Sequence, residues 1–212
     1  MSTAGLIAAA GLSTRMGRPK AMLPVGASGI PFVWQLASVY VEAGLKPVII
    51  TIPDGEVGDV VEAMLKPLSI NPAAQILCVR NDDPAQGFSG SVLTALVRAA
   101  TSTGLVITPV DAPHATAALI GALVQGLMTT TADAVVAVVG QKRAHPVAFR
   151  KTMWRRLASC AARGGPATLL DELAIEGSLH AIPWGDWRVL EDINTPEDWE
   201  RAFAMPFPGK AR

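Results

Sequence analysis

The chain has no excess of charge of either sign, because 18 Lys and Arg residues balance 18 Asp and Glu residues among its 212 residues. Nucleic acids and anionic membrane surfaces select strongly basic partners, so we expect neither as a partner of this protein. An anionic ligand must therefore be held by a local site rather than by the overall field of the molecule.

Long hydrophobic runs and a basic segment before the first apolar residues are also lacking. No apolar run reaches the ~18 residues of a membrane span, and the N-terminus does not have the form of a signal peptide. The two cysteines, Cys78 and Cys160, lack the spacing of a metal site and are expected to be reduced thiols. A cytoplasmic protein is therefore expected.

Short apolar runs alternate with amphipathic segments along the whole chain. This alternation is typical of a mostly parallel sheet with helices on both faces. The sequence predicts a single-domain, three-layer α/β/α fold with a Rossmann-like sheet over residues 1–204, followed by a flexible tail over 205–212. Strands are predicted at 5–9, 47–52, 75–79, 105–110 and 134–139, with short ones at 179–183 and 188–190. Helices are predicted at 32–43, 57–68, 89–100, 116–128, 152–162, 167–173 and 196–203.

The loop after the first predicted strand reads AAGLSTRMGRPK, from Ala9 to Lys20. Ligands of such folds bind beyond the carboxyl ends of the strands, where this loop must lie. Gly11 and Gly17 let the backbone approach a ligand closely, and successive N–H groups can form an anion-binding concavity. Arg15 and Lys20 can pair with phosphate oxygens.

Two well-known phosphate-binding patterns are absent from this loop. The Walker A spacing of glycine and lysine is not present, and neither is the Gly-x-Gly-x-x-Gly dinucleotide fingerprint. From the residues alone, a solvated basic loop is as good an interpretation as a phosphate site.

The stretch from Ile7 to Lys20 resembles the Leu-Ala-Ala-Gly-x-Ser-x-Arg-Met-Gly-x-x-Lys motif of the MobA-like nucleotidyltransferases, which act in molybdenum cofactor maturation. The resemblance implies a fold of the nucleotide-diphospho-sugar transferase type. The Ala-Ala doublet before the glycine is similar to the cytidylyltransferase (MocA-like) branch, whereas the guanylyltransferase branch usually has Ala-Gly-Gly. The nucleotide-binding residues implied in this motif are Ala9, Ala10, Gly11, Ser13, Arg15, Gly17 and Lys20.

A second segment, from Asn81 to Ser91, resembles the Asn-x(n)-Gly-Met-Ser-x-Ser segment of the MocA-like enzymes. The resemblance implies nucleotide contacts by Asn81, Gly87 and Ser89. A loop that leads into a helix N-terminus can offer free N–H groups to a base edge, a ribose or a phosphate. An ordinary Ser N-cap is the alternative interpretation of the same residues.

Two acidic residues are candidate metal ligands. Asp111, in the sequence VDAP after the fourth predicted strand, matches a metal-binding Asp of the family, and a carboxylate there can hold Mg²⁺ or Mn²⁺ on a triphosphate. Asp192, in the closing motif DINTPED, is a candidate second ligand, and Asn194 a less certain one. The alternatives are a turn-forming Asp111 and, at Thr195-Pro196, an ordinary helix start.

The acceptor side of the resemblance is less complete. His145, in HPVAF, resembles the family's His-Pro-x-x-Phe element and is expected to line the acceptor site or to orient a loop. The family then has Gly-Asp-x-Gly-x-Arg, where this chain has Gly165 in place of the Asp and Thr168 in place of the Arg. Whatever that segment does for the acceptor is therefore altered in this protein.

The resemblance implies transfer of CMP from CTP to the terminal phosphate of the molybdopterin cofactor, with release of pyrophosphate. Arg15 and Lys20 would stabilise phosphate charge, and a metal at Asp111 would bridge phosphate oxygens. The remaining alternatives are a guanylyltransferase, transfer to a sugar or polyol phosphate, and a non-catalytic chaperone that passes the cofactor to an apo molybdenum hydroxylase. The missing glycine fingerprint disfavours a Rossmann oxidoreductase.

Overall fold

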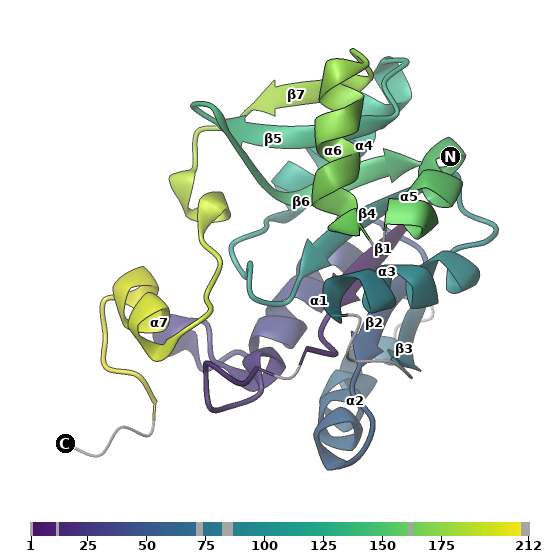
Figure 1. Ribbon diagram of the computed structural model, residues 1–212. Coiled ribbons are helices and arrows are strands. Elements are labelled where there is room, and N and C mark those ends of the chain that lie inside the picture. Colours follow the sequence, from purple (N-terminus) through teal and green to yellow (C-terminus); the bar gives the residue numbers. More distant parts are fainter. Residues whose placement is uncertain (1, 12, 71–73, 82–86, 161–162, 209–212) are drawn as a thin grey trace.

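The computed structural model describes residues 2–11, 13–70, 74–81, 87–160 and 163–208 (Figure 1). The strands are β1 Thr3–Ala8, β2 Val48–Ile52, β3 Ile76–Arg80, β4 Gly104–Pro109, β5 Ala134–Val139, β6 Lys142–Arg150 and β7 Leu179–Pro183. The α-helices are α1 Phe32–Glu42, α2 Glu56–Ser69, α3 Gly87–Arg98, α4 Ala117–Thr129, α5 Trp154–Cys160, α6 Pro166–Ile175 and α7 Pro196–Phe203. Short 3-10 helices include η1 Lys20–Met22 and η6 Trp187–Leu190.

The strands form one seven-stranded sheet in the order β3-β2-β1-β4-β6-β5-β7. β6 runs antiparallel to its neighbours β4 and β5, whereas the other pairings are parallel. The expected mostly parallel α/β/α fold is therefore confirmed, with one antiparallel strand inside the sheet.

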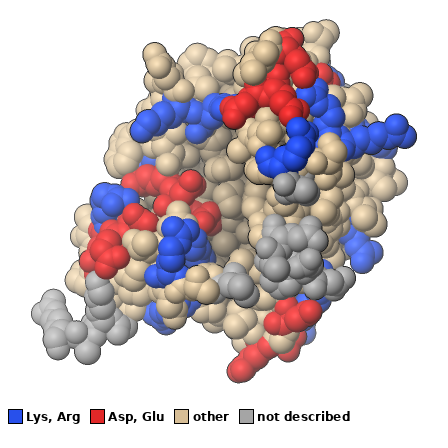
Figure 2. Space-filling view, in the orientation of Figure 1, with Lys and Arg blue, Asp and Glu red and all other residues tan. Residues whose placement is uncertain are grey.

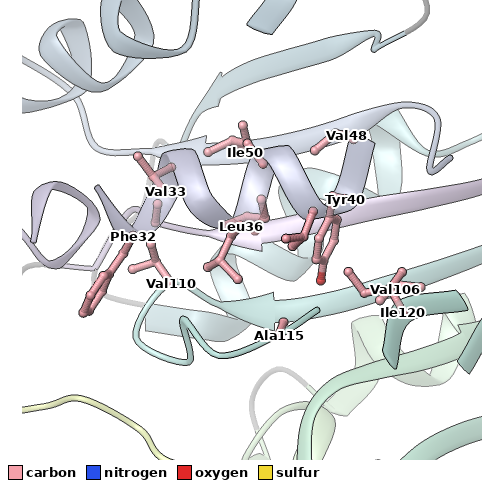
Figure 3. Packing of buried hydrophobic residues seen from close by; sticks show 14 of the residues in the cluster. Phe32, Val33, Leu36, Tyr40, Val48, Ile50, Val106, Val110, Ala115 and Ile120 are labelled. Carbon is pink, nitrogen blue, oxygen red and sulfur yellow. The ribbon is translucent and has the colours of Figure 1, made fainter. Parts of the chain in front are cut away.

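Two hydrophobic clusters cover the two faces of this sheet. Ile7 of β1 packs in the cluster that contains α1, α2 and α4, whereas its neighbour Leu6 packs in the cluster with α3, α5 and α6. Figure 1 shows the second group of helices in front of the sheet. Figure 3 shows Leu36 and Tyr40 of α1 on the side of Val110 and Val106 in the first cluster. The near-continuous apolar strands are thus explained by burial on both faces.

The sequence expectations differ from the structure in two places. β6 was not expected as a strand, and the short strand expected at 188–190 is part of the 3-10 helix η6, whose first turn is capped by Asp186. Near the C-terminal end of the described residues, Phe207 is buried with its ring against Trp199 of α7. Residues 209–212 of the expected tail, and 161–162 of the helix expected at 152–162, lie outside the described residues.

The ends of β1 and β4 lie side by side at the carboxyl edge of the sheet. Ala8 pairs with Pro109, and the N–H of Val110 donates to the carbonyl of Ala8 at 3.0 Å. The loops that follow the two strands therefore begin next to each other, which brings the basic first loop beside Asp111. Within the described residues, no helix is both long enough and apolar enough to cross a membrane.

Candidate functional site

The first loop is folded around Ser13. The N–H groups of Met16 and Gly17 donate to the carbonyl of Ser13 at 3.1 and 3.2 Å, and the Ser13 hydroxyl accepts from the N–H of Lys20 at 3.0 Å. Gly17 has a φ of 69°, in the left-handed region that glycine adopts without strain. The loop thus turns back on itself and delivers Lys20, at the start of η1, to the sheet edge.

Lys20 and Arg15 meet polar side chains from two other parts of the chain. The Lys20 Nζ lies 2.7 Å from Asp111 Oδ2 and donates to Asn194 Oδ1 at 2.8 Å. The Arg15 guanidinium donates to the same Asn194 oxygen at 2.9 Å. The Lys20–Asp111 pair is largely withdrawn from solvent, with side-chain exposures of 13% and 18%. Three segments distant in sequence therefore converge on one charged cluster.

Asn194 is held in place by the start of α7. Its N–H and that of Thr195 donate to the Asp198 carboxylate at 3.0 and 2.9 Å, and the Thr195 hydroxyl accepts from the N–H of Asp198, which completes a capping box. The fully buried Trp199 anchors the helix by donating its Nε1–H to a loop carbonyl at 2.9 Å. The start of α7 is therefore part of the site, because the capping box positions the Asn194 amide oxygen that accepts hydrogen bonds from Arg15 and Lys20.

The backbone ties Asp192 to the same cluster. The N–H of Ile193 donates to the carbonyl of Asp111 at 2.8 Å. Burial raises the pKa of Asp192, the nearby carboxylate of Asp111 raises it further, and His145 and Lys20 oppose the shift. Burial lowers the pKa of His145, against the pull of the two carboxylates. Four of the expected site residues therefore share one electrostatic environment.

These residues provide oxygen donors of the kind that Mg²⁺ and Mn²⁺ prefer, namely two carboxylates and the Asn194 amide oxygen. No group of three His, Cys, Asp or Glu side chains poised around a single metal position occurs among the described residues. A divalent cation here would therefore complete its ligand set with phosphate oxygens and water, which is usual for Mg²⁺ bound with a nucleotide.

A cavity of about 180 Å³ opens beside this cluster. It lies in the recess in the middle of the face shown in Figure 2, where mixed acidic and basic side chains gather on the side of α7. Five expected nucleotide or metal residues line it, namely Gly11, Ser13, Lys20, Gly87 and Asp111. Phe88 and Ser91 of α3 line it as well.

The other expected nucleotide residues do not line this cavity, and they are Ala9, Ala10, Arg15, Gly17, Asn81 and Ser89. Ala9, Ala10 and Asn81 are almost fully buried. Arg15 lies over Asn194, and Ser89 faces Gly165, where an added Cβ would stand 2.7 Å from the Ser89 hydroxyl.

Comparison with known proteins now agrees with this geometry. Residues 5–177 match the family of MobA-like NTP transferase domains. The chain belongs to this family. It is a nucleotidyltransferase of the MobA-like type, and its matched region contains Arg15, Lys20 and Asp111, whereas Asp192 and Asn194 follow it in the chain.

Individual relatives are more distant. The chain is 26% identical over 201 residues to the molybdenum cofactor guanylyltransferase of Xanthomonas euvesicatoria pv. vesicatoria (strain 85-10), which covers 93% of this chain and 92% of the relative. It resembles the structure of a nucleotidyl transferase from Methanothermobacter thermautotroptrophicus with a TM-score of 0.73 and 20% identity, over 96% of each chain. The complex of Rv0371c with manganese from Mycobacterium tuberculosis H37Rv gives a TM-score of 0.69 and 20% identity, over 97% and 99%. At these identities, the two structures show the shared fold alone.

Several site features of this MobA-like nucleotidyltransferase could not be read from the motifs. Asn194 was expected as a possible metal ligand, whereas the structure makes it the acceptor for two cations of the first loop, Arg15 and Lys20. Phe88 and Ser91 line the cavity and were not singled out. Their position among the first five residues of a helix that starts at the sheet edge was the available signal.

Proposed function

We propose that this nucleotidyltransferase transfers CMP from CTP to the terminal phosphate of the molybdopterin form of molybdenum cofactor and releases pyrophosphate. The observation that carries the proposal is the convergence of Lys20 and Arg15 with Asp111 and Asn194 beside a cavity formed by the first loop and α3. Cations and carboxylate at one cavity suit a triphosphate that binds together with a metal.

Each residue has a part in this reaction. An oxygen of the acceptor phosphate attacks the α-phosphorus in line, and the new P–O bond forms as the bond to pyrophosphate breaks. Lys20 and Arg15 neutralise charge on the α-phosphate and on the leaving pyrophosphate, and the cluster fixes their positions before the substrate arrives. Asp111 and Asp192 would hold Mg²⁺ or Mn²⁺, which supplies positive charge to the phosphate oxygens.

Support for cytosine comes from the doublet Ala9-Ala10, and support for the acceptor comes from the name of the Xanthomonas relative. Because that relative is named a guanylyltransferase, its name also favours GTP as the substrate, and a guanylyltransferase is the second candidate. A cofactor chaperone for an apo molybdenum hydroxylase remains a distinct outcome of the experiment below.

The test is pyrophosphate release from CTP, GTP, ATP and UTP, each with molybdopterin cofactor and Mg²⁺. We expect kcat/KM for CTP to exceed that for the other triphosphates by about 100-fold, because a site that pairs with one base leaves its polar groups unsatisfied by another. Removal of Mg²⁺ with a chelator should stop the release. A preference for GTP would establish the guanylyltransferase, and cofactor binding without release from any triphosphate would establish the chaperone.

The variant Ala10→Gly tests the origin of base preference, since it produces the Ala-Gly-Gly sequence of the guanylyltransferase branch. Ala10 is buried beside the phosphate loop, with 2% of its surface exposed. Because the change removes a buried methyl group one residue before Gly11, which lines the nucleotide cavity, we expect the CTP-to-GTP ratio of kcat/KM to fall about tenfold or more. The matched control is Ala9→Gly, which removes the neighbouring methyl without producing that sequence. Equal ratios in both variants would show that the doublet does not set the base.

A further inference from the structure

A second cavity, of about 260 Å³, lies next to the nucleotide cavity. The side chain of Phe88 lines both of them. The walls of the second cavity come from β6, from Ile107 of β4 and from the starts of α3 and α6. A molecule bound there would be a direct neighbour of a nucleotide bound beside Lys20.

One face of β6 provides a graded wall for this cavity. Arg143, His145, Val147 and Phe149 all line it, as the two-residue period of a strand requires. Phe149 and Val147 are buried, His145 is half-buried and Arg143 is exposed. The wall therefore changes from apolar at depth to cationic at the rim.

The rim of this wall lies at the catalytic edge of the sheet. Ile107 of β4 pairs with Val147 of the antiparallel β6. From this pair, β4 runs forward towards Asp111 while β6 runs backward towards Arg143. Asp111 and Arg143 therefore lie towards the same edge of the sheet, and a group bound at Arg143 would lie on the side where Lys20 and Asp111 meet.

The start of α6 forms the opposite wall. The helix begins at Pro166 after Gly165, with no side-chain cap and no acidic residue in its first turn. Gly165 has a φ of 70°, and an added Cβ would stand 2.7 Å from the Ser89 hydroxyl, so a larger residue would push α6 away from α3. The positive end of the helix dipole therefore faces the cavity without a competing carboxylate.

Two polar side chains of this cavity are not fully used by the fold. His145 Nδ1 is buried and has no hydrogen-bond partner within the described part of the chain. Arg143 is the one cationic side chain among the described residues that line the cavity, and its partner is Asp171 of α6. That ion pair is open to water, with side-chain exposures of 37% and 63%, so a better ligand for the guanidinium can compete with it.

We propose that Arg143 recognises the phosphate of the acceptor, and that this cavity takes an acceptor whose ring system packs on apolar walls. The proposal rests on the nucleotidyl transfer proposed above and adds the residue and substrate class for its acceptor half. A sugar or polyol phosphate is disfavoured, because the walls of Ile107, Val147 and Phe149 offer its hydroxyl groups no hydrogen bonds and His145 Nδ1 can serve only one of them. A guanidinium suits a phosphate because its N–H groups bind two oxygens at once.

The test separates the two substrates kinetically. Arg143→Ala is expected to raise the KM for molybdopterin cofactor about 10- to 100-fold, the loss of a charge-assisted hydrogen bond, with an unchanged KM for CTP. Arg143→Lys keeps the positive charge but cannot bind two phosphate oxygens at once. Its KM for molybdopterin cofactor is expected to lie between those of the wild type and Arg143→Ala. The matched control is Lys142→Ala, which removes a positive charge from the preceding residue of β6 that does not line the cavity.

A second variant distinguishes recognition from a purely structural ion pair. If Arg143 acted only by holding Asp171, Asp171→Ala would raise the acceptor KM as much as Arg143→Ala does. We expect Asp171→Ala to leave that KM within about twofold of the wild-type value, because an exposed ion pair contributes little. An unchanged acceptor KM in Arg143→Ala, or an equal rise in Asp171→Ala, would overturn the proposal.

The wild-type protein tests the substrate class. With glucose 1-phosphate or glycerol 3-phosphate in place of the cofactor, we expect no pyrophosphate release above background, and release at the cofactor rate would refute the apolar-ring requirement. Equilibrium dialysis of molybdopterin against wild type and Arg143→Ala measures the same site without turnover. If the wild type transfers no nucleotide, the proposed function fails, whereas weaker dialysis binding by Arg143→Ala would still support the subsite.

Discussion

Replacing Asp111 with Asn is expected to lower turnover by about 1,000-fold, because the change removes the charge that holds both Lys20 and the proposed metal. Asn keeps the size of the side chain and one acceptor oxygen, so the loss would report charge rather than shape. Pyrophosphate release would be measured as a function of Mg²⁺ concentration, and the variant should show no saturation in the range where the wild type does.

The fold should survive this substitution. Lys20 retains Asn194 as a partner at 2.8 Å, and the hydrogen bond from the N–H of Ile193 reaches the carbonyl of residue 111 rather than its side chain. The matched control is Asp59→Asn, which removes an exposed carboxylate of α2 from its ion pair with Arg80 of β3 and should leave activity unchanged. Wild-type activity with normal Mg²⁺ dependence in Asp111→Asn would refute the site assignment.

Much of the fold could be predicted because the strands are buried on both faces. Runs such as that of β2, in which every residue is buried, have a composition that only a central strand requires. β6 escaped prediction because it begins with exposed Lys142 and Arg143 and contains Pro146, all of which are unusual in the middle of a sheet. Its place between β4 and β5 is set by tertiary packing, and the sequence does not indicate which strands will be its neighbours in the sheet.

The part of the candidate site that could be predicted consists of motifs that directly follow a strand. Lys20 and Asp111 were placed at one sheet edge by the rule for parallel strands, and the structure brings them to 2.7 Å. The position of Asn194 was not predictable, because it depends on the docking of α7 through Trp199 to a loop 175 residues earlier in the chain. The cavity at Arg143 was hidden for the same reason, since β6 and α6 form it only after they pack.

The variant Lys20→Met is expected to lose turnover as Asp111→Asn does, but to bind the metal more tightly instead of losing it. Turnover should fall about 100- to 1,000-fold, because the ammonium that stabilises charge on the transferred phosphate is gone. Met keeps the apolar stem of the side chain and its packing. Asp111 is then left as a half-buried carboxylate without its cation, which destabilises the folded state.

Mg²⁺ should reverse that destabilisation, since a ligand that binds the folded state alone raises its stability. The melting temperature of Lys20→Met should therefore rise more with added Mg²⁺ than that of the wild type, where Lys20 competes for the same carboxylate, and Asp111→Asn should not respond. The matched control is Lys66→Met, at the exposed last turn of α2, which should behave as the wild type in turnover and in its response to Mg²⁺. Equal Mg²⁺ shifts in Lys20→Met and Asp111→Asn would contradict a metal at Asp111, since only one of the two variants retains the carboxylate.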